Sequence, residues 1–175
     1  MSDAAFVAVD WGTTSFRLWL MSASGEILGE RRSGEGMTTA MQTGFANVLS
    51  SHLAALSAPA GLPVIICGMA GARQGWVEAG YVDVPADLSE VLKGAVRVEG
   101  QTDDIRILPG LAQRSNDAPD VMRGEETQLL GALSEHHKTG EQLVRMPGTH
   151  SKWVSVNALK VTGFSTFMTG ELFDV

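Results

Sequence analysis

The hydrophobic pattern of the first 32 residues predicts three consecutive β-strands. Residues 5–10 are almost all apolar, which is typical of a strand buried on both of its faces. Residues 16–21 and 27–32 follow at short spacing, and the polar turn between them contains Gly25. The three segments therefore predict an antiparallel meander, which the Gly-Glu-Gly sequence at 34–36 brings to an end.

After the meander, the apolar residues are spaced as in a helix. Apolar side chains recur every three or four positions across residues 42–57, so this segment is expected to form an amphipathic helix. Residues 63–67 form a short apolar run, which predicts a buried strand. Farther on, Asp87 and Glu90 have the spacing of a capping box, which predicts a helix extending to Val96.

The remaining apolar segments complete a repeating order of elements. Residues 105–108 predict another strand, and residues 124–138 predict a helix. The order is three strands, helix, strand, helix, strand, helix, followed by a new run of strands. It predicts an α/β fold that is duplicated within the chain, with a first lobe over residues 1–140 and the start of a second over residues 141–175.

A short motif is repeated where the strands of the two predicted lobes end. Gly12, Thr13 and Ser15 recur 136 positions later as Gly148, Thr149 and Ser151. In both copies an apolar strand enters a Gly-Thr-x-Ser turn. Glycine lets the backbone approach a ligand closely, and turn N–H groups and hydroxyls donate to oxyanions. We interpret the turns as two phosphate cradles for a nucleotide, with chance similarity of a short motif as the alternative.

Asp10 is the candidate metal ligand. It ends the first predicted strand two positions before Gly12, where a carboxylate can hold Mg²⁺ while the turn holds phosphates. The alternative is an aspartate that caps its own turn. Met146 occupies the matching position of the second copy, so only the first cradle could position a metal in this way.

Arg123, Glu125 and Glu126 are candidates for catalysis and substrate binding, at the start of the helix predicted over 124–138. One carboxylate would accept the proton of an attacking hydroxyl. The alternative is that both acids merely favour the positive end of the helix dipole. Arg123 would pair with a carboxylate or phosphate of a ligand, or else form a surface ion pair.

Four further side chains lie in or beside the glycine-containing loops. His150 and Lys152 belong to the second cradle, where either would contact phosphate or, for His150, support it by hydrogen bonding. Trp11 and Trp76 lie in glycine loops and are the tryptophans expected to touch a ligand, with burial in the core as the alternative.

Composition narrows the class of protein. The chain has 175 residues, 44% of them hydrophobic and 19% charged, and a formal net charge of −7. That charge argues against a nucleic-acid partner, which a basic face would bind. Cys67 is the single cysteine and is expected to be a buried hydrophobe. With neither a signal peptide nor a membrane-spanning stretch recognised, a cytoplasmic location and no membrane partner are expected.

Other common site motifs are missing from the sequence. It contains no Gly-x-x-x-x-Gly-Lys-Ser/Thr phosphate loop and no Gly-x-Ser-x-Gly nucleophile elbow. The glycine spacing at 68–71 does not fit a dinucleotide site.

Six motifs together resemble the 2-dehydro-3-deoxygalactonokinase family. They are Val-Asp-Trp-Gly-Thr-Thr at 9–14, Gly-Met-Ala-Gly at 68–71 with Gly-Trp at 75–76, Pro-Gly-Leu at 109–111, Val-Met-Arg-Gly-Glu-Glu-Thr-Gln-Leu-Leu-Gly at 121–131, Met-Pro-Gly-Thr-His-Ser-Lys-Trp-Val at 146–154 and Thr-Gly-Glu-Leu at 169–172. The resemblance covers essentially the whole chain. It implies a ribonuclease-H-like (actin-like ATPase) lobe with a mixed five-stranded sheet and flanking helices, followed by the first strands of a second lobe.

The resemblance also implies a reaction. Members transfer the γ-phosphoryl group of ATP, with Mg²⁺, to the 6-hydroxyl of 2-dehydro-3-deoxy-D-galactonate in galactonate breakdown. By position, Asp10 would hold the metal, and Gly12, Thr13 and Thr14 would form the first phosphate loop. Gly148, Thr149 and His150 would form the second loop.

For the general base and the substrate, the resemblance leaves choices open. Either Glu125 or Glu126 would be the base, because sliding the motif by one residue changes which glutamate fits. Because the chain is acidic and the substrate anionic, a local cation is needed; Arg123 is the first candidate and Arg73 the second. Trp76 would line the substrate pocket.

Family members continue into a complete second lobe that carries the adenosine pocket, whereas this sequence stops at Val175. It is therefore expected to be a fragment that is inactive by itself. The competing hypotheses are a kinase of another sugar or sugar acid, and a non-catalytic lobe that acts as a binding module. Small-molecule ligands, and possible assembly into a homo-oligomer, are the partners expected.

Overall fold

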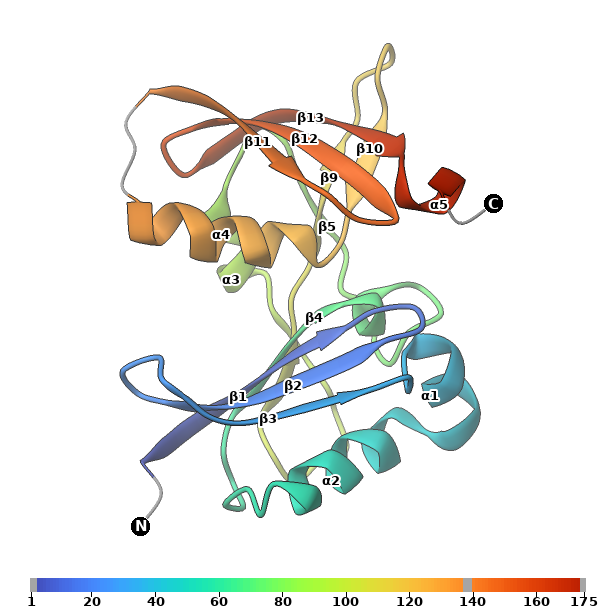
Figure 1. The fold of residues 1–175 in the computed structure, drawn as a ribbon, viewed down its shortest axis with the longest axis vertical. Coiled ribbons are helices and arrows are strands. Elements are labelled where there is room, and N and C mark those ends of the chain that lie inside the picture. Colours follow the sequence, from blue (N-terminus) through green and yellow to red (C-terminus); the bar gives the residue numbers. More distant parts are fainter. Residues whose placement is uncertain (1–2, 137–139, 174–175) are drawn as a thin grey trace. The chain divides into compact units, whose positions relative to one another are not determined.

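The computed structural model describes residues 3–136 and 140–173 (Figure 1). The contacts divide the chain into two compact units. Unit 1 comprises Met1–Gly80 and Ala95–Pro109, and unit 2 comprises Tyr81–Gly94 and Gly110–Val175. Each unit is described by itself.

Unit 1 is built on a six-stranded mixed sheet with the order β3-β2-β1-β4-β8-β7. The strands are β1 (Ala4–Trp11), β2 (Phe16–Ser22), β3 (Ile27–Ser33), β4 (Val64–Gly68), β7 (Val96–Arg97) and β8 (Ile105–Ile107). The predicted meander of β1, β2 and β3 is confirmed, and β4 and β8 add to it in parallel. This is the ribonuclease-H-like α/β class expected. The sheet has one strand more than predicted, because the two-residue β7 pairs antiparallel with β8 at the edge and is too short to show periodicity.

The helix expected over residues 42–57 corresponds to α2 (Phe45–Ala55), and its first two residues belong to a separate helix, α1 (Met37–Thr43). Gly44 separates them with a φ of 90° and is the C-cap of α1 as well as the N-cap of α2. That backbone conformation suits glycine and ends the first helix. The predicted apolar stripe, which begins at Phe45, is confirmed as that of α2, whereas the separate helix α1 before Gly44 was not predicted.

One hydrophobic core fills unit 1. Val7, Val9 and Leu18 come from the meander, Ile66 from β4 and Leu49 from α2, and all are at most 2% exposed. The expectation that Cys67 is a buried hydrophobe is confirmed, since it is 7% exposed. The sheet and the two helices therefore fix the loops that follow β1 and β4.

In its described residues, unit 2 contains two smaller sheets and three helices. One sheet has the order β10-β9-β5 and the other the order β11-β12-β13-β6. The strands are β5 (Tyr81–Asp83), β6 (Ala86–Asp87), β9 (Gly110–Gln113), β10 (Asp120–Met122), β11 (Glu141–Met146), β12 (His150–Asn157) and β13 (Lys160–Met168). The helices are α3 (Leu88–Lys93), α4 (Glu125–His136) and α5 (Gly170–Phe173), besides the 3-10 turn η1 (Met69–Gly71) of unit 1.

The short strands β5, β6, β9 and β10 were not predicted, because two to four residues carry no recognisable alternation. β11, β12 and β13 form the second meander that was expected after residue 140. The end of the helix predicted over 124–138 lies partly outside the described residues.

The N-terminus of α3 differs in one detail from the predicted capping box. The side chain of Asp87 caps the helix by accepting from the N–H of Ser89 at 2.8 Å. Glu90 does not complete the box, because its carboxylate binds Lys93 at 2.7 Å, and the helix ends at Lys93 instead of Val96.

The compact units divide the chain at other places than the expected lobe boundary near residue 140. Residues 81–94 join unit 2 because β6 pairs with β13 and α3 packs against α4. Compactness and internal duplication are different properties, so the assignment of residues 1–140 and 141–175 to two lobes stays a prediction. Among the described residues, no helix is both long and apolar enough to cross a membrane.

Candidate functional site

The first Gly-Thr turn connects β1 to β2 and is closed by a backbone hydrogen bond. The N–H of Gly12 donates to the carbonyl of Ser15 at 2.8 Å. Thr13 and Thr14 are exposed at the tip. A Cβ at Gly12 would lie 2.8 Å from Ser15 Oγ, so glycine suits this tight turn. The turn offers hydroxyl groups and bare backbone at the surface, as a phosphate cradle requires.

The start of α1 packs against this turn and binds its carbonyl groups. The N–H of Met37 donates to Gly12 O at 2.9 Å, and both the N–H and the hydroxyl of Thr38 donate to Thr13 O at 3.1 Å. A Cβ at Gly36 would lie 2.5 Å from backbone atoms of the turn. These carbonyl oxygens already accept hydrogen bonds from α1. They are therefore not directed at an anion bound at the turn, which they would repel.

The second Gly-Thr turn, between β11 and β12, is bound in the same manner. The N–H of Gly170 donates to Gly148 O at 3.2 Å, and the N–H of Glu171 donates to Thr149 O at 3.1 Å. Gly170 and Glu171 begin α5 just as Met37 begins α1. In both units, consecutive N–H groups of the helix after the meander bind the carbonyls of a Gly-Thr pair. This shared pattern favours duplication over chance similarity.

Asp10 lies within β1, opposite Arg17 on β2. Its Oδ2 is 3.5 Å from Arg17 Nη1, and its side chain is 23% exposed. Burial raises the pKa of the Asp10 carboxyl, and the charge of Arg17 opposes that shift. The carboxylate thus forms an ion pair across the strands, and the turn beside it is closed by backbone groups instead of a side-chain cap.

The acidic pair at the start of α4 divides into an exposed and a buried member. Glu126 is 0% exposed, and both of its carboxylate oxygens accept from the N–H of Gly124 at 2.8 Å. Burial, the largest cause, raises the pKa of Glu126 to about 7. Glu125 is half-buried and accepts from the N–H of Arg123 at 3.0 Å. Only Glu125 has a side chain open to the surface.

The guanidinium of Arg123 stacks on an aromatic ring. Its Cζ lies 4.4 Å from the centroid of Tyr81, which β5 contributes. A planar guanidinium stacked in this way is held in one orientation. Tyr81 was not recognised from the sequence, because no motif links it to residue 123.

The glycine loop after β4 carries Arg73 and Trp76. Gly68 is the register partner of Trp11 in parallel strands, so this loop and the first Gly-Thr turn leave the sheet at the same edge. Arg73 is exposed, whereas Trp76 is half-buried and stacks on Phe45 at 5.9 Å. Trp11 is 0% exposed, so the expectation that it touches a ligand is wrong; its ring packs in the core.

Comparison with known proteins identifies the family. Residues 10–175 match the family model described as 2-keto-3-deoxy-galactonokinase. The chain belongs to the 2-keto-3-deoxy-galactonokinase family. The matched span contains both Gly-Thr turns and the acidic pair of α4.

Two curated proteins with the synonymous 2-dehydro name are similar to the chain. A protein named "Probable 2-dehydro-3-deoxygalactonokinase" from Rhizobium meliloti (strain 1021) is 64% identical over 169 residues. The 2-dehydro-3-deoxygalactonokinase of Escherichia coli (strain K12) is 38% identical over 169 residues. Each match covers 97% of this chain and 55% of the relative. The chain therefore spans about half the length of these members of the kinase family.

Solved structures agree with this assignment. A crystal structure of a protein assigned to the 2-dehydro-3-deoxygalactonokinases of Sinorhizobium meliloti has a TM-score of 0.91 and 64% identity, and the match covers 97% of this chain and 56% of that one. An exopolyphosphatase from Cytophaga hutchinsonii has a TM-score of 0.50 at 15% identity and covers 97% of this chain and 52% of that one. The second likeness shows the fold alone.

Within the second cradle of this kinase-family chain, His150 and Lys152 have different surroundings. His150 Nε2 lies 2.5 Å from Glu171 Oε2, and both side chains are about half exposed. Lys152 is only 6% exposed and donates to Val121 O at 2.8 Å and to Thr166 Oγ1 at 2.6 Å. The expectation that Lys152 contacts phosphate is wrong, since its buried ammonium group donates its hydrogen bonds to Val121 and Thr166 in the interior of unit 2.

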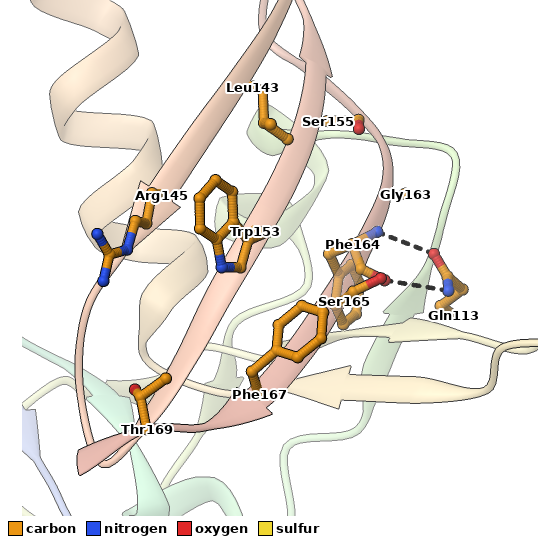
Figure 2. A pocket seen from close by; sticks show the side chains of 10 residues that line it. All are labelled: Gln113, Leu143, Arg145, Trp153, Ser155, Gly163, Phe164, Ser165, Phe167 and Thr169. Carbon is orange, nitrogen blue, oxygen red and sulfur yellow. Dashed lines mark hydrogen bonds between the residues drawn. The ribbon is translucent and has the colours of Figure 1, made fainter. Parts of the chain in front are cut away.

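A hollow of about 770 Å³ lies elsewhere in unit 2, over the β11-β12-β13 sheet (Figure 2). It is lined by Gln113, Leu143, Arg145, Trp153, Ser155, Gly163, Phe164, Ser165, Phe167 and Thr169. None of the site residues predicted from the sequence lines it. Gln113 ties the two sheets of unit 2 together, since its amide accepts from the N–H of Phe164 at 2.9 Å and donates to the carbonyl at 3.2 Å.

The structure brings the predicted site residues of this family member together in three groups. Unit 1 holds Asp10, Gly12, Thr13, Thr14, Arg73 and Trp76 at one edge of its sheet. Unit 2 holds Arg123 with Glu125 and Glu126, and separately Gly148, Thr149 and His150. The supporting residues Gly36 and Gly170 were missed, although Gly-Glu-Gly at 34–36 and Thr-Gly-Glu at 169–171 carried the signal.

Proposed function

We propose that the protein carrying this chain is an ATP-dependent kinase of 2-dehydro-3-deoxy-D-galactonate that phosphorylates the 6-hydroxyl. The observation that carries the proposal is the match of residues 10–175 to the kinase family, with two Gly-Thr turns in that span. Since ATP is the donor, we expect the reaction in the cytoplasm, as part of galactonate breakdown.

The two turns are proposed to bind the phosphate oxygens of ATP. Thr13 and Thr14 supply hydroxyl groups in unit 1, and Thr149 supplies a hydroxyl group beside the backbone of Gly148 in unit 2. His150 is proposed to contact phosphate, and the contact of its Nε2 with Glu171 Oε2 at 2.5 Å orients the ring beside the second turn. In both turns the carbonyl oxygens of the Gly-Thr pair accept hydrogen bonds from the N–H groups of a helix. This reduces the electrostatic repulsion between these oxygens and a bound phosphate.

Asp10 fits a role in holding Mg²⁺. The described residues contain no group of three or more His, Cys, Asp or Glu side chains placed to hold a metal. Mg²⁺ does not need one, since one or two carboxylates, substrate phosphates and waters complete its shell. The carboxylate of Asp10 is partly buried beside the turn, and a cation would favour its charged form. When bound, Mg²⁺ would neutralise charge on the phosphate oxygens.

Glu125 is proposed as the general base. Its side chain is the accessible member of the pair, and a base must reach the hydroxyl whose proton it accepts. As the 6-oxygen bonds to phosphorus and the bond to ADP breaks, Glu125 takes the hydroxyl proton. Glu126 is enclosed and bound to Gly124, so its role is to hold the turn that precedes Glu125.

Arg123 is proposed to bind the carboxylate of the sugar acid. Stacking on Tyr81 fixes its guanidinium plane, which suits bidentate recognition of a carboxylate. Arg73 and Trp76 remain the further candidates for the sugar side of the site. Both lie on the loop after β4, and Arg73 is exposed.

An ADP-release assay tests the proposal. A protein of full family length that carries this chain is supplied with ATP, Mg²⁺ and a panel of sugar acids. Rapid ADP release with 2-dehydro-3-deoxy-D-galactonate supports the function. Preference for another acid would keep the kinase and change its substrate, whereas release with none would leave the binding-module alternative.

A further inference from the structure

We infer that His52, acting through Glu35, is a positioning residue for the first Gly-Thr turn. The inference rests on the proposed function in one respect only, namely that this turn binds the phosphates of ATP. The hydrogen bonds of His52 go to Glu35 and Ser33, so its polar contacts reach the turn through the loop at residues 34–36.

His52 occupies a core position on α2. It is 4% exposed, follows Val48 and Leu49 on the apolar stripe of the helix, and stacks on Phe16 at 4.5 Å between ring centroids. A buried polar ring is costly unless it is hydrogen-bonded, and an apolar residue would fill this place more simply. The histidine at this position therefore calls for a reason other than filling space.

The polar contacts of His52 all run from one edge of the ring. Its Nε2 lies 2.8 Å from Glu35 Oε2 and 3.3 Å from Ser33 Oγ. Nδ1 is buried and has no hydrogen-bond partner in the part of the chain that the structure describes. The ring is thus aimed at the loop that follows β3.

Glu35 connects this contact to the turn. Its backbone carbonyl accepts from Trp11 Nε1 at 3.1 Å, and its N–H donates to Ser33 Oγ at 3.2 Å. The next residue, Gly36, leaves no room for a Cβ against the turn. A carboxylate gripped by His52 therefore fixes a loop whose backbone is in contact with the phosphate-binding turn.

Amide hydrogen exchange in a protein of full family length that carries this chain tests these contacts directly. His52→Leu keeps the volume of the side chain and removes the bond to Glu35. We expect exchange at residues 12–15 and 34–38 to speed up roughly tenfold, the effect of losing one hydrogen bond to a charged group. His52→Gln, whose amide can still donate to Glu35, should restore most of the protection.

Leu49→Ala supplies the matched control, since Leu49 is 2% exposed on the same helix and its apolar side chain forms none of the hydrogen bonds in the argument. It should lower global stability but leave residues 12–15 no more affected than the rest of unit 1. Equal exchange in His52→Leu and the unaltered chain, or the same local effect in Leu49→Ala, would overturn the inference.

Kinetics give the second readout, in a protein of full family length. His52→Leu should raise the KM for ATP about tenfold and leave the KM for the sugar acid within about twofold. An equal rise in both would overturn the positioning role. If the unaltered protein phosphorylates no sugar acid, the proposed function fails, while the exchange experiment still decides the inference.

Discussion

Both carboxylate oxygens of Glu126 accept the backbone N–H of Gly124, each at 2.8 Å. The Glu126 side chain therefore turns back to the residue before α4, and it is 0% exposed. Glu125, one position earlier, remains half-buried and open to the surface. The two adjacent acids therefore differ in what they can do, and their substitution should separate catalysis from support.

Replacing Glu125 by Gln should lower kcat by ~10²–10⁴, because the variant keeps the shape of the side chain but cannot take up a proton. Glu126→Gln should lower kcat by less, since the amide oxygen can still accept from Gly124. Steady-state ADP release by both variants checks this. Greater loss in Glu126→Gln would reverse the assignment, and full activity in both would mean that the base lies elsewhere.

The stability of the chain should depend on pH through Glu126. Its folded pKa of about 7 lies above the ordinary glutamate value, so between about pH 4.5 and 7 the folded state keeps a proton that the unfolded state loses. The contribution of Glu126 to the free energy of unfolding is therefore fully present below pH 4.5. It declines as the pH rises through 7, by roughly 3 kcal/mol in total.

Urea unfolding between pH 5 and 8 checks this prediction. Glu126→Gln should show a flatter dependence than the unaltered chain, because it has no proton to lose. Glu125→Gln retains Glu126 and should decline like the unaltered chain. Parallel curves for the unaltered chain and Glu126→Gln would contradict the prediction.

Asp10→Asn should lower kcat by at least ~10², the order found when a group that stabilises transition-state charge is removed. The thermal unfolding midpoint should change little, because the side chain is partly exposed and its partner Arg17 is near the surface. Asp104→Asn is the control, since Asp104 also pairs with an arginine but lies outside the proposed site. Near-normal turnover in Asp10→Asn would rule out the metal role.

Arg123→Lys should raise the KM for the sugar acid and leave that for ATP nearly unchanged, because an ammonium group cannot reproduce a planar bidentate contact. Arg145→Lys is the matched control, since that guanidinium also stacks on an aromatic ring, Trp153, and is not among the groups proposed to bind the sugar acid. An equal rise for both substrates would place Arg123 at the phosphates. No change would indicate a surface role.

Gly36→Ala should destabilise unit 1 by ~1–3 kcal/mol, because the added Cβ would lie 2.5 Å from backbone atoms that cannot move aside cheaply. It should also weaken ATP binding, since the displaced atoms belong to the turn. In contrast, Gly131→Ala adds a methyl group in open space inside α4 and should stabilise the chain by ~0.5–1 kcal/mol. Thermal unfolding and nucleotide titration of both variants check the pair.

Much of the fold could be predicted because its strongest signals are local. The alternation and apolar runs of β1 to β4 and the stripe of α2 depend on neighbouring residues alone. The short strands of unit 2 could not be found in this way, since their pairing with distant strands makes them strands. Gly44 ends α1 directly before the apolar stripe of α2, and the stripe itself does not reveal the helix that precedes it.

By itself, the sequence determined the two meanders, the two Gly-Thr turns and the family, because strand patterning and turn chemistry are written in consecutive residues. Only the tertiary structure decided which side chains could serve a site. Successive residues of a helix point about 100° apart, so Glu125 meets the surface while Glu126 meets the interior. Lys152 and Trp11 are likewise enclosed by segments distant in the sequence, and the support of the first turn by α1 and Gly36 joins positions more than twenty residues apart. Burial and close packing depend on the whole chain, and no local pattern records them.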